Sequence, residues 1–328
     1  PPVEANGGVI SFIPSTALSD GNYSLTATAS DSAGNTSPLS SAITLVVDTS
    51  VPSAPMISVP SPTNNNTPTI SGTAEADSTV TISAGGQALG QATANSGSSY
   101  TLALSSALAD GTYTLTATAQ DQAGNVSATS GGTALLVDTV APNNPTITDS
   151  NQANTSTPQV SVTAETGGTV TVNAGNTSLG QATVDTGGVY SVTTTSLSDG
   201  SYTLTAIVMD SAGNSSEASV QFVLNIDTVA PSAPAIAVAT PTNDATPSIV
   251  GSAEANSEVT ISDGGTVLGQ ATVDSAGAFS FVTATLSEGA HSITAVATDS
   301  AGNTSAASDT LSLVVDLTPP TITLTGAD

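Results

Sequence analysis

The stretch DGTYTLTATAQDQAGN, residues 110–125, decides the fold. Its apolar side chains, Tyr113, Leu115, Ala117 and Ala119, alternate with threonines, so one face is apolar and the other carries hydroxyl groups. Alternation with a period of two is typical of a β-strand that has one buried face. An Asp-Gly pair precedes the alternation and a Gly-Asn pair follows it, and both pairs favour turns. The stretch therefore predicts one long strand between two tight turns.

The end of this stretch, Asp-x-Ala-Gly-Asn, recurs in register along the chain. Its copies begin, at steps of 90, 89 and 89 residues, at Asp31, Asp121, Asp210 and Asp299. A second marker, an Asp with a Pro four residues later, follows each copy by 17 residues, at Asp48, Asp138, Asp227 and Asp316. A third marker, Ala-Glu, supplies Glu75, Glu165 and Glu254. Three markers with one period indicate a tandem repeat of a single kind of domain.

A period of about 89 residues is too long for a solenoid repeat and suits one small β-sandwich. We expect complete domains at 49–138, 139–227 and 228–316, the second half of a domain at 1–48, and a linker with the start of another domain at 317–328. Turn residues divide the first complete domain into seven expected strands, near 55–60, 68–74, 79–84, 87–94, 99–104, 112–120 and 133–138. The predicted fold class is all-β, with tandem immunoglobulin-like Greek-key β-sandwiches arranged as an extended rod.

The motif Leu-x-Asp-Gly-x-Tyr, which begins at Leu108, predicts a tyrosine corner, in which the phenol bonds to nearby backbone. Tyr202 and Tyr23 occupy the same position in other copies, and the last copy has His291 there. We interpret this histidine as a substituted corner residue. The alternative, a catalytic base, fits its aligned position less well.

Composition excludes several classes of partner. The 328 residues include no Lys, no Arg and 26 Asp plus Glu, for a formal net charge of −26. Binding to nucleic acid or to anionic lipid needs clustered basic residues, and direct membrane insertion needs an apolar run that the chain lacks. The chain has no Cys, which excludes disulfides and thiolate metal sites. Its hydrophobic content of 38% and its alternation argue against disorder.

The expected topology brings carboxylates together at the joints between domains. If strands reverse at each connection, the loop after the second strand and the loop after the sixth lie at the end that faces the preceding domain. Glu75 begins the first of these loops, Asp121 begins the second, and Asp48 lies in the linker before the domain. The same logic groups Asp138 with Glu165 and Asp210, and Asp227 with Glu254 and Asp299.

Three neighbouring carboxylates cannot all stay ionised without a counter-charge, and no basic side chain except one His is present. Calcium accepts carboxylates, carbonyls and water in flexible geometry, whereas magnesium demands a stricter octahedron. We therefore predict one Ca²⁺ per joint. The alternative is that each Asp simply closes a turn or ends a strand.

Other acidic residues have simpler interpretations. Asp20, Asp110, Asp199 and Glu288 lie at the opposite end of each domain, where they would serve the corner turn or a second metal ion. We expect the carboxylates of the hairpin connections to be solvated turn residues: Asp185, Asp263 and Asp274. An Asn-x-Ser pattern at Asn125, Asn214 and Asn303 matches a glycosylation acceptor, but a turn explains it adequately.

These motifs resemble the bacterial immunoglobulin-like (BIg) repeats of giant Gram-negative non-fimbrial adhesins of the SiiE-like type and of biofilm-associated proteins. The resemblance rests on DGTYTLTATAQDQAGN (110–125), DGSYTLTAIVMDSAGN (199–214), VDTVAP (137–142) and TPTISGTAE (67–75). It implies type I secretion, a long rod at the bacterial cell surface, a role in adhesion and virulence, and calcium at the aspartates near the linkers. The receptor would be a host-cell surface or a glycan, bound through the parent protein.

Two other functions compete with an adhesin stalk. A glycan-binding module would need a groove with stacking aromatic residues, and the chain has only four Phe and five Tyr. A glycosidase could use paired carboxylates, but here they recur once per repeat, and a catalytic site seldom needs three copies in a row. We therefore expect no enzymatic activity.

Overall fold

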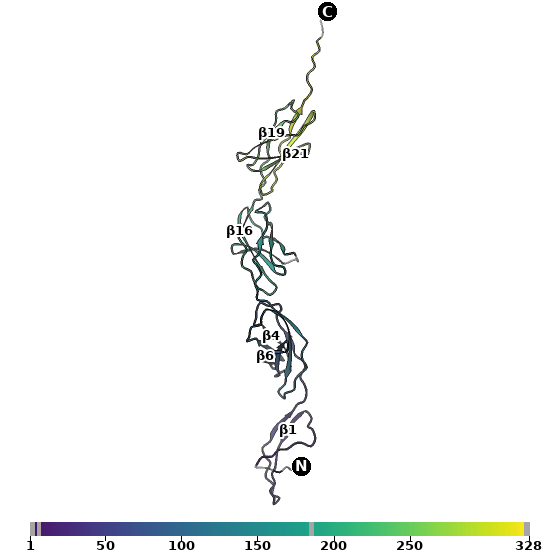
Figure 1. The fold of residues 1–328 in the computed structure, drawn as a ribbon, viewed down its shortest axis with the longest axis vertical. Helices are drawn as coiled ribbons and strands as arrows, with labels where there is room; N and C mark the ends of the chain where they lie inside the picture. The colour runs from purple at the N-terminus through teal and green to yellow at the C-terminus, as the bar shows by residue number, and fades with distance from the viewer. Residues whose placement is uncertain (1–3, 5–7, 184–186, 325–328) are drawn as a thin grey trace. The chain divides into compact units, whose positions relative to one another are not determined.

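The computed structural model describes residues 4, 8–183 and 187–324, so Asp185 lies outside the described residues. Every regular element in them is a β-strand, which confirms the all-β class (Figure 1). Within that part of the chain there is no helix long and apolar enough to span a membrane. The chain divides into two compact units, one formed by residues 1–140 with 211–214, the other by residues 141–210 with 215–328.

The half-repeat at the start of the first unit forms one two-stranded sheet. β1 (Gly21–Leu25) pairs antiparallel with β2 (Ile43–Val47). No further strand covers this sheet in the described residues, and its side chains Leu25 and Leu45 are 42% and 39% exposed.

The first complete repeat is a sandwich of two sheets, and all seven expected strands are present. One sheet has the order β3–β4–β7, with strands β3 (Met56–Ser58), β4 (Thr69–Thr73) and β7 (Ser99–Ala103). The other has the order β6–β5–β8–β9, with strands β5 (Thr79–Ala84), β6 (Gln87–Thr93), β8 (Gly111–Gln120) and β9 (Thr133–Val137).

The repeats of the second unit have the same plan. In the first of them, the sheets β10–β12–β15 and β11–β17–β16–β13–β14 consist of β10 (Thr146–Ile147), β11 (Gln152–Ala153), β12 (Gln159–Thr163), β13 (Thr169–Ala174), β14 (Thr177–Thr183), β15 (Val189–Thr193), β16 (Gly200–Met209) and β17 (Phe222–Ile226). In the second, the sheets β18–β19–β22 and β21–β20–β23–β24 consist of β18 (Ala235–Ala237), β19 (Ser248–Ser252), β20 (Glu258–Asp263), β21 (Thr266–Thr272), β22 (Ala278–Val282), β23 (Gly289–Thr298) and β24 (Leu311–Val315).

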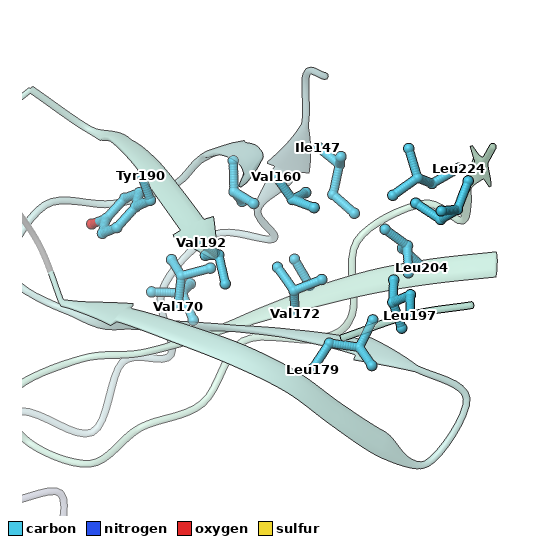
Figure 2. Packing of buried hydrophobic residues seen from close by; sticks show 14 residues of the cluster. Ile147, Val160, Val170, Val172, Leu179, Tyr190, Val192, Leu197, Leu204 and Leu224 are labelled. Carbon is cyan, nitrogen blue, oxygen red and sulfur yellow. The ribbon is translucent and has the colours of Figure 1, made fainter. Parts of the chain in front are cut away.

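The apolar face of each strand forms the core between the two sheets. Ile70, Ile82, Leu115 and Leu135 are fully buried in the first complete repeat. Figure 2 shows the corresponding core of the next repeat, in which Val160 and Val192 of one sheet face Val170 and Val172 of the other. Aliphatic side chains therefore build a packed core without a disulfide or a tryptophan.

The first strand of each complete repeat is split between the two sheets. β10 pairs antiparallel with β12, and the chain then crosses so that β11 pairs in parallel with β17. Single bridges, Thr63 with Val137 and Thr242 with Val315, make the same parallel contact in the other repeats. We expected strands that reverse at each connection but not this pairing, which joins the first and last strands of a repeat directly.

The predicted tyrosine corners are confirmed. The hydroxyl group of Tyr113 donates to Ala109 O at 2.9 Å, and that of Tyr202 donates to Ser198 O at 3.0 Å. Tyr23 makes the same bond to Ser19 O in the half-repeat, at 2.8 Å. Each bond ties a strand to the turn that precedes it.

Candidate functional site

The aspartate that begins each Asp-x-Ala-Gly-Asn motif organises the turn after the sixth strand. Asp121 Oδ1 accepts a hydrogen bond from Asn125 N at 2.8 Å, and Oδ2 accepts one from Asn125 Nδ2, also at 2.8 Å. These bonds, the one from the Asn125 side chain first, hold the pKa of Asp121 below its ordinary value, although desolvation opposes them. Asp121 therefore closes the turn after β8, and a metal ion would have to share this carboxylate with the turn.

The same turn occurs in other copies. Asp299 Oδ1 accepts bonds from Ala301 N at 2.9 Å and Asn303 N at 2.8 Å. Burial acts to raise the pKa of Asp299, but the hydrogen bonds from Asn303 and its neighbours outweigh burial, and the net shift is downward. Asp31 has the equivalent bonds in the half-repeat, and its pKa is lowered first by the Asn35 side chain. Asp210 directly follows β16 and is partly buried.

The linker aspartates use both their side chains and their carbonyl groups. Asp48 Oδ1 accepts a bond from Ser50 N at 3.0 Å, and Asp227 Oδ1 accepts one from Val229 N, also at 3.0 Å. The third linker residue, Asp138, bonds Val140 N in the same way at 3.1 Å. Each carboxylate therefore caps the backbone two residues ahead and fixes the start of its linker.

The asparagine of the motif connects the turn to the linker. Asn125 Nδ2 donates to Asp48 O at 3.0 Å as well as to Asp121 Oδ2, so one amide joins two of the three residues predicted to share a calcium ion. In the second unit, Asn303 Nδ2 joins Asp227 O and Asp299 Oδ2, at 2.8 Å each. In the first unit, which includes residues 211–214, Asn214 Nδ2 donates to Asp138 O at 2.8 Å.

The predicted glutamate ligands are not part of these connections. The side chains of Glu75, Glu165 and Glu254 are exposed. The carbonyl group of Glu75 accepts bonds from Ser78, that of Glu254 accepts bonds from Ser257, and that of Glu165 accepts one from the Tyr190 hydroxyl group. Glu165 also lines a shallow hollow with Asn143, Asn144, Thr146 and Thr163.

Within the described residues, no group of three or more Asp, Glu or His side chains lies close enough to hold a metal ion. The donor set at the linkers consists of carboxylate and carbonyl oxygens, which are the ligands that calcium prefers. The chemistry of the residues thus fits calcium, and the gathering of three carboxylates around one ion stays a prediction.

The carboxylates at the opposite end of each domain bind the linker that follows. Asp110 Oδ1 accepts bonds from Thr139 N at 3.1 Å and from Thr139 Oγ1 at 2.9 Å. The bonds from Thr228 to Asp199 have the same two lengths. In the last repeat, Thr318 Oγ1 donates to Glu288 Oε1 at 2.7 Å. We expected these residues to serve the corner turn, and the structure shows that they hold the linker threonine.

Sequence reasoning missed the asparagines that bind the linkers and their neighbours. A turn is the role that the sequence predicts for Asn125 and its equivalents, although their recurrence in register signals a second role. Asn154 Nδ2 also donates to Gly302 O at 3.1 Å, and Asn64 Nδ2 donates to Gly213 O at 2.9 Å. Asn154 and Asn64 occupy equivalent positions, 90 residues apart, just after the split first strand.

The serine of the Asn-x-Ser pattern is structural. Ser127 is buried, and its hydroxyl oxygen accepts a bond from Ala119 N at 2.9 Å. Ser305 bonds Ala297 N in the same way, also at 2.9 Å. Because the serine completes the hydrogen bonding of the sixth strand and the asparagine binds the linker, the turn explanation accounts for this pattern.

The last repeat contains one confirmed prediction and one correction. His291 takes the place of the corner tyrosine, since its Nε2 lies 2.9 Å from Ser287 O. Asp263 was predicted to be a solvated turn residue, which is wrong. It ends β20, and its Oδ2 lies 2.7 Å from His291 Nδ1. Asp274 does form an exposed turn, in which its Oδ1 accepts bonds from Ala276 N and Ala278 N.

Comparison with known proteins gives one family match. The family described as the bacterial Ig-like domain matches residues 2–49, 58–139, 141–228 and 237–317. A comparison with curated protein sequences gives no match.

Several solved structures are similar to the chain. The fibronectin(III)-like modules of Clostridium thermocellum CbhA have 20% identity and a TM-score of 0.37, over 52% of this chain and 93% of that one. A tetra-tandem repeat in the extending region of a large adhesion protein has 26% identity and a TM-score of 0.27, over 92% and 83%. The BSP domain of a biofilm associated protein has 16% identity and a TM-score of 0.23, over 83% and 69%.

Proposed function

Because the chain belongs to the family of bacterial Ig-like domains, we propose that it is a structural repeat segment of a secreted bacterial surface adhesin, stiffened by Ca²⁺ bound at its linkers. The observation that carries this proposal is the pairing of each linker with the turn of the next repeat. Asn125 joins Asp48 to Asp121, and Asn303 joins Asp227 to Asp299. In each of these two cases one amide attaches a linker to the repeat that follows it, which supports a structural role for the chain.

The net negative charge of the chain supports the binding of calcium. The formal net charge is −26, and no Lys or Arg neutralises it. The residues that would hold the ions are the linker Asp, the Ala-Glu glutamate and the turn Asp of each joint, namely Asp48, Glu75, Asp121, Asp138, Glu165, Asp210, Asp227, Glu254 and Asp299. Extracellular calcium modules bind at roughly 10⁻⁴–10⁻³ M, so the ions would load only outside the cell, where mass action would stabilise the joints.

We further propose a route of secretion and a location for this segment. The segment would pass through a type I secretion system as a loose polyanion and fold at the bacterial cell surface. It would there extend or present the adhesive part of its parent protein toward a host-cell surface or a glycan receptor. We also propose that the parent protein acts in biofilm formation and virulence. The segment itself would have no enzymatic activity.

Small-angle X-ray scattering of the full chain tests the calcium stiffening directly. The maximum dimension should be larger, and the profile that of a stiffer particle, with about 1 mM calcium, a concentration in the range of extracellular modules, than with a chelator. The variant that combines Asp227→Asn with Glu254→Gln should lose part of this response. Its matched control combines Asp274→Asn with Glu258→Gln, which removes two exposed carboxylates from the repeat that contains Glu254.

Identical profiles in calcium and in chelator would refute calcium stiffening. The amide hydrogen bonds of Asn125 and Asn303 would then account for the joints alone. Isothermal titration calorimetry separates this outcome from weak binding, because it counts the bound ions independently of any change of shape.

A glycan-binding module is the second candidate function. The aromatic side chains that could stack on a sugar are mostly occupied, since Tyr100 and Tyr190 are buried and three tyrosines form corners. Among the described residues, Phe12 is the one exposed aromatic side chain, and it is 57% exposed. A specific hit for this chain on a glycan array, lost on Phe12→Ala, would favour the second candidate.

A further inference from the structure

The corner of the last repeat is built from a different pair of residues than the other corners. In the earlier repeats a tyrosine hydroxyl group donates to the carbonyl group four residues before it, with Tyr113 and Tyr202 as examples. In the last repeat, His291 Nε2 lies 2.9 Å from Ser287 O, so a ring nitrogen replaces the hydroxyl group on the same backbone acceptor.

A second replacement accompanies the first. Asp263 ends β20, while the last residues of the equivalent strands β5 and β13 are Ala84 and Ala174. Asp263 Oδ2 lies 2.7 Å from His291 Nδ1, and Asp263 Oδ1 accepts a bond from Ser292 N at 2.8 Å. The acidic partner therefore occurs only in the repeat that carries the histidine, and it contacts the histidine ring.

The contacts of the ring require two protons. Ser287 O and the Asp263 carboxylate can only accept hydrogen bonds, whereas a neutral imidazole carries one N–H group and one lone pair. Only the imidazolium form can donate to both acceptors. In agreement with this geometry, the pKa of His291 is raised, first by the Ser287 carbonyl group and then by Asp263, against a smaller opposing effect of burial.

Few other charges surround the ring. β24, which pairs with β23 at His291, carries no titratable side chain, and neither do β18, β19 and β22 of the facing sheet. Within β20, the other carboxylate is that of Glu258, at the opposite end of the strand. Glu288 belongs to the corner turn, but its Oε1 accepts a bond from Thr318 in the linker. The Asp263 carboxylate is therefore the charge in contact with the imidazole.

We propose that the last repeat is a proton-dependent module, in which the His291–Asp263 pair holds the corner only while the imidazole is protonated. A group whose pKa is higher in the folded than in the unfolded state contributes stability that is fully present below the unfolded pKa. This contribution is lost as the pH rises through the folded pKa. The last repeat thus weakens from mildly acidic to mildly alkaline pH, whereas the other corners contain no imidazole.

Loss of the proton from His291 should also affect the linker that follows the last repeat. The turn tied down by His291 contains both Ser287 and Glu288, and Glu288 binds Thr318. When the imidazole loses a proton, its one remaining N–H group faces the Asp263 carboxylate, which is a stronger acceptor than a carbonyl group. The turn then loses the bond from Nε2 to Ser287 O, and its hold on the linker weakens. This inference stands whether or not calcium binds at the joints.

Proton NMR of the full chain provides the test, because His291 is the only histidine and its ring signals need no further assignment. The titration midpoint should be higher in the folded chain than in urea, and each unit of difference equals a tenfold change in the folding equilibrium constant. Asp263→Asn should lower the folded midpoint toward the unfolded one. Both titrations are run with chelator and again with calcium, so that a failure of calcium stiffening leaves the result unaffected.

The matched control restores the corner of the other repeats by combining His291→Tyr with Asp263→Ala. In this variant, the amides of β23 and β24 should have the same protection factors at pH 5.5 and 8.5. These factors are measured by hydrogen exchange and corrected for the intrinsic pH dependence of exchange. In the unaltered chain the protection factors should be several-fold lower at pH 8.5. A folded midpoint at or below that in urea would overturn the proposal, and this comparison needs no variant that could fail to fold.

Discussion

The half-repeat and the first complete repeat carry nearly the same residues in very different surroundings. Leu25 and Leu115 occupy equivalent positions, yet Leu25 is 42% exposed and Leu115 is fully buried. Leu45 and Leu135 differ in the same way, at 39% and 0%. The difference lies in the second sheet, because β4 and β7 cover β8 and β9 while no strand in the described residues covers β1 and β2. The alternation of a strand specifies which face can be buried, and the partner sheet decides whether burial occurs.

Truncating the equivalent leucines should give the largest contrast between the two regions. Leu115→Ala removes a fully buried side chain and should lower the free energy of unfolding of its repeat by about 2–5 kcal/mol. Leu25→Ala removes a side chain that is already 42% exposed and should cost less than about 1 kcal/mol. Amide hydrogen exchange of the full chain, followed by mass spectrometry, measures the loss of protection in β8 and in β1. Equal losses of protection would mean that the half-repeat has a core of its own.

Removing the asparagine of the turn should give a smaller contrast. Asn125 Nδ2 bonds both Asp121 and the linker residue Asp48, whereas Asn35 Nδ2 has the bond to Asp31. Asn125→Ala should therefore cost more than Asn35→Ala, and the difference should be one neutral hydrogen bond, about 1 kcal/mol. Proteolysis in the linker at 48–52 is the second readout, since it should quicken only in Asn125→Ala. A linker that is cut equally fast in both variants would contradict the role of Asn125.

The tyrosine corners should give the smallest contrast. Tyr113 and Tyr23 make the same bond, to Ala109 O at 2.9 Å and to Ser19 O at 2.8 Å. Replacement by Phe deletes only the hydroxyl group, so each variant should lose about 0.5–1.5 kcal/mol and the two losses should agree closely. Urea denaturation followed by amide exchange over the two turns measures them. A much larger loss at Tyr113 would show that the corner depends on the second sheet.

The sequence predicted the strands well and the polar contacts poorly, for a physical reason. A strand such as 112–120 is specified by its own alternation, and β8 begins and ends within one residue of that prediction. The bond between Asn125 and Asp48 joins residues 77 positions apart, and a motif that also satisfies a local turn gives no hint of the distant partner. Asp263 was misassigned because a Gly-Gly turn follows it, and this local signal says nothing about a histidine 28 positions further along. The metal sites remain predictions because they depend on where flexible carboxylates settle around an ion.

The parallel contact between the first and last strands has a mechanical consequence. In the first complete repeat, Thr63 N donates to Leu136 O at 3.0 Å, and Asp138 N donates to Thr63 O at 3.0 Å. Tension along the chain enters a repeat ahead of Thr63 and leaves it after Asp138, so it pulls two parallel segments in opposite directions. The hydrogen bonds between them are then loaded together in shear, instead of being peeled apart one after another. A repeat whose first and last segments are bonded in parallel in this way resists stretching through the combined strength of these bonds.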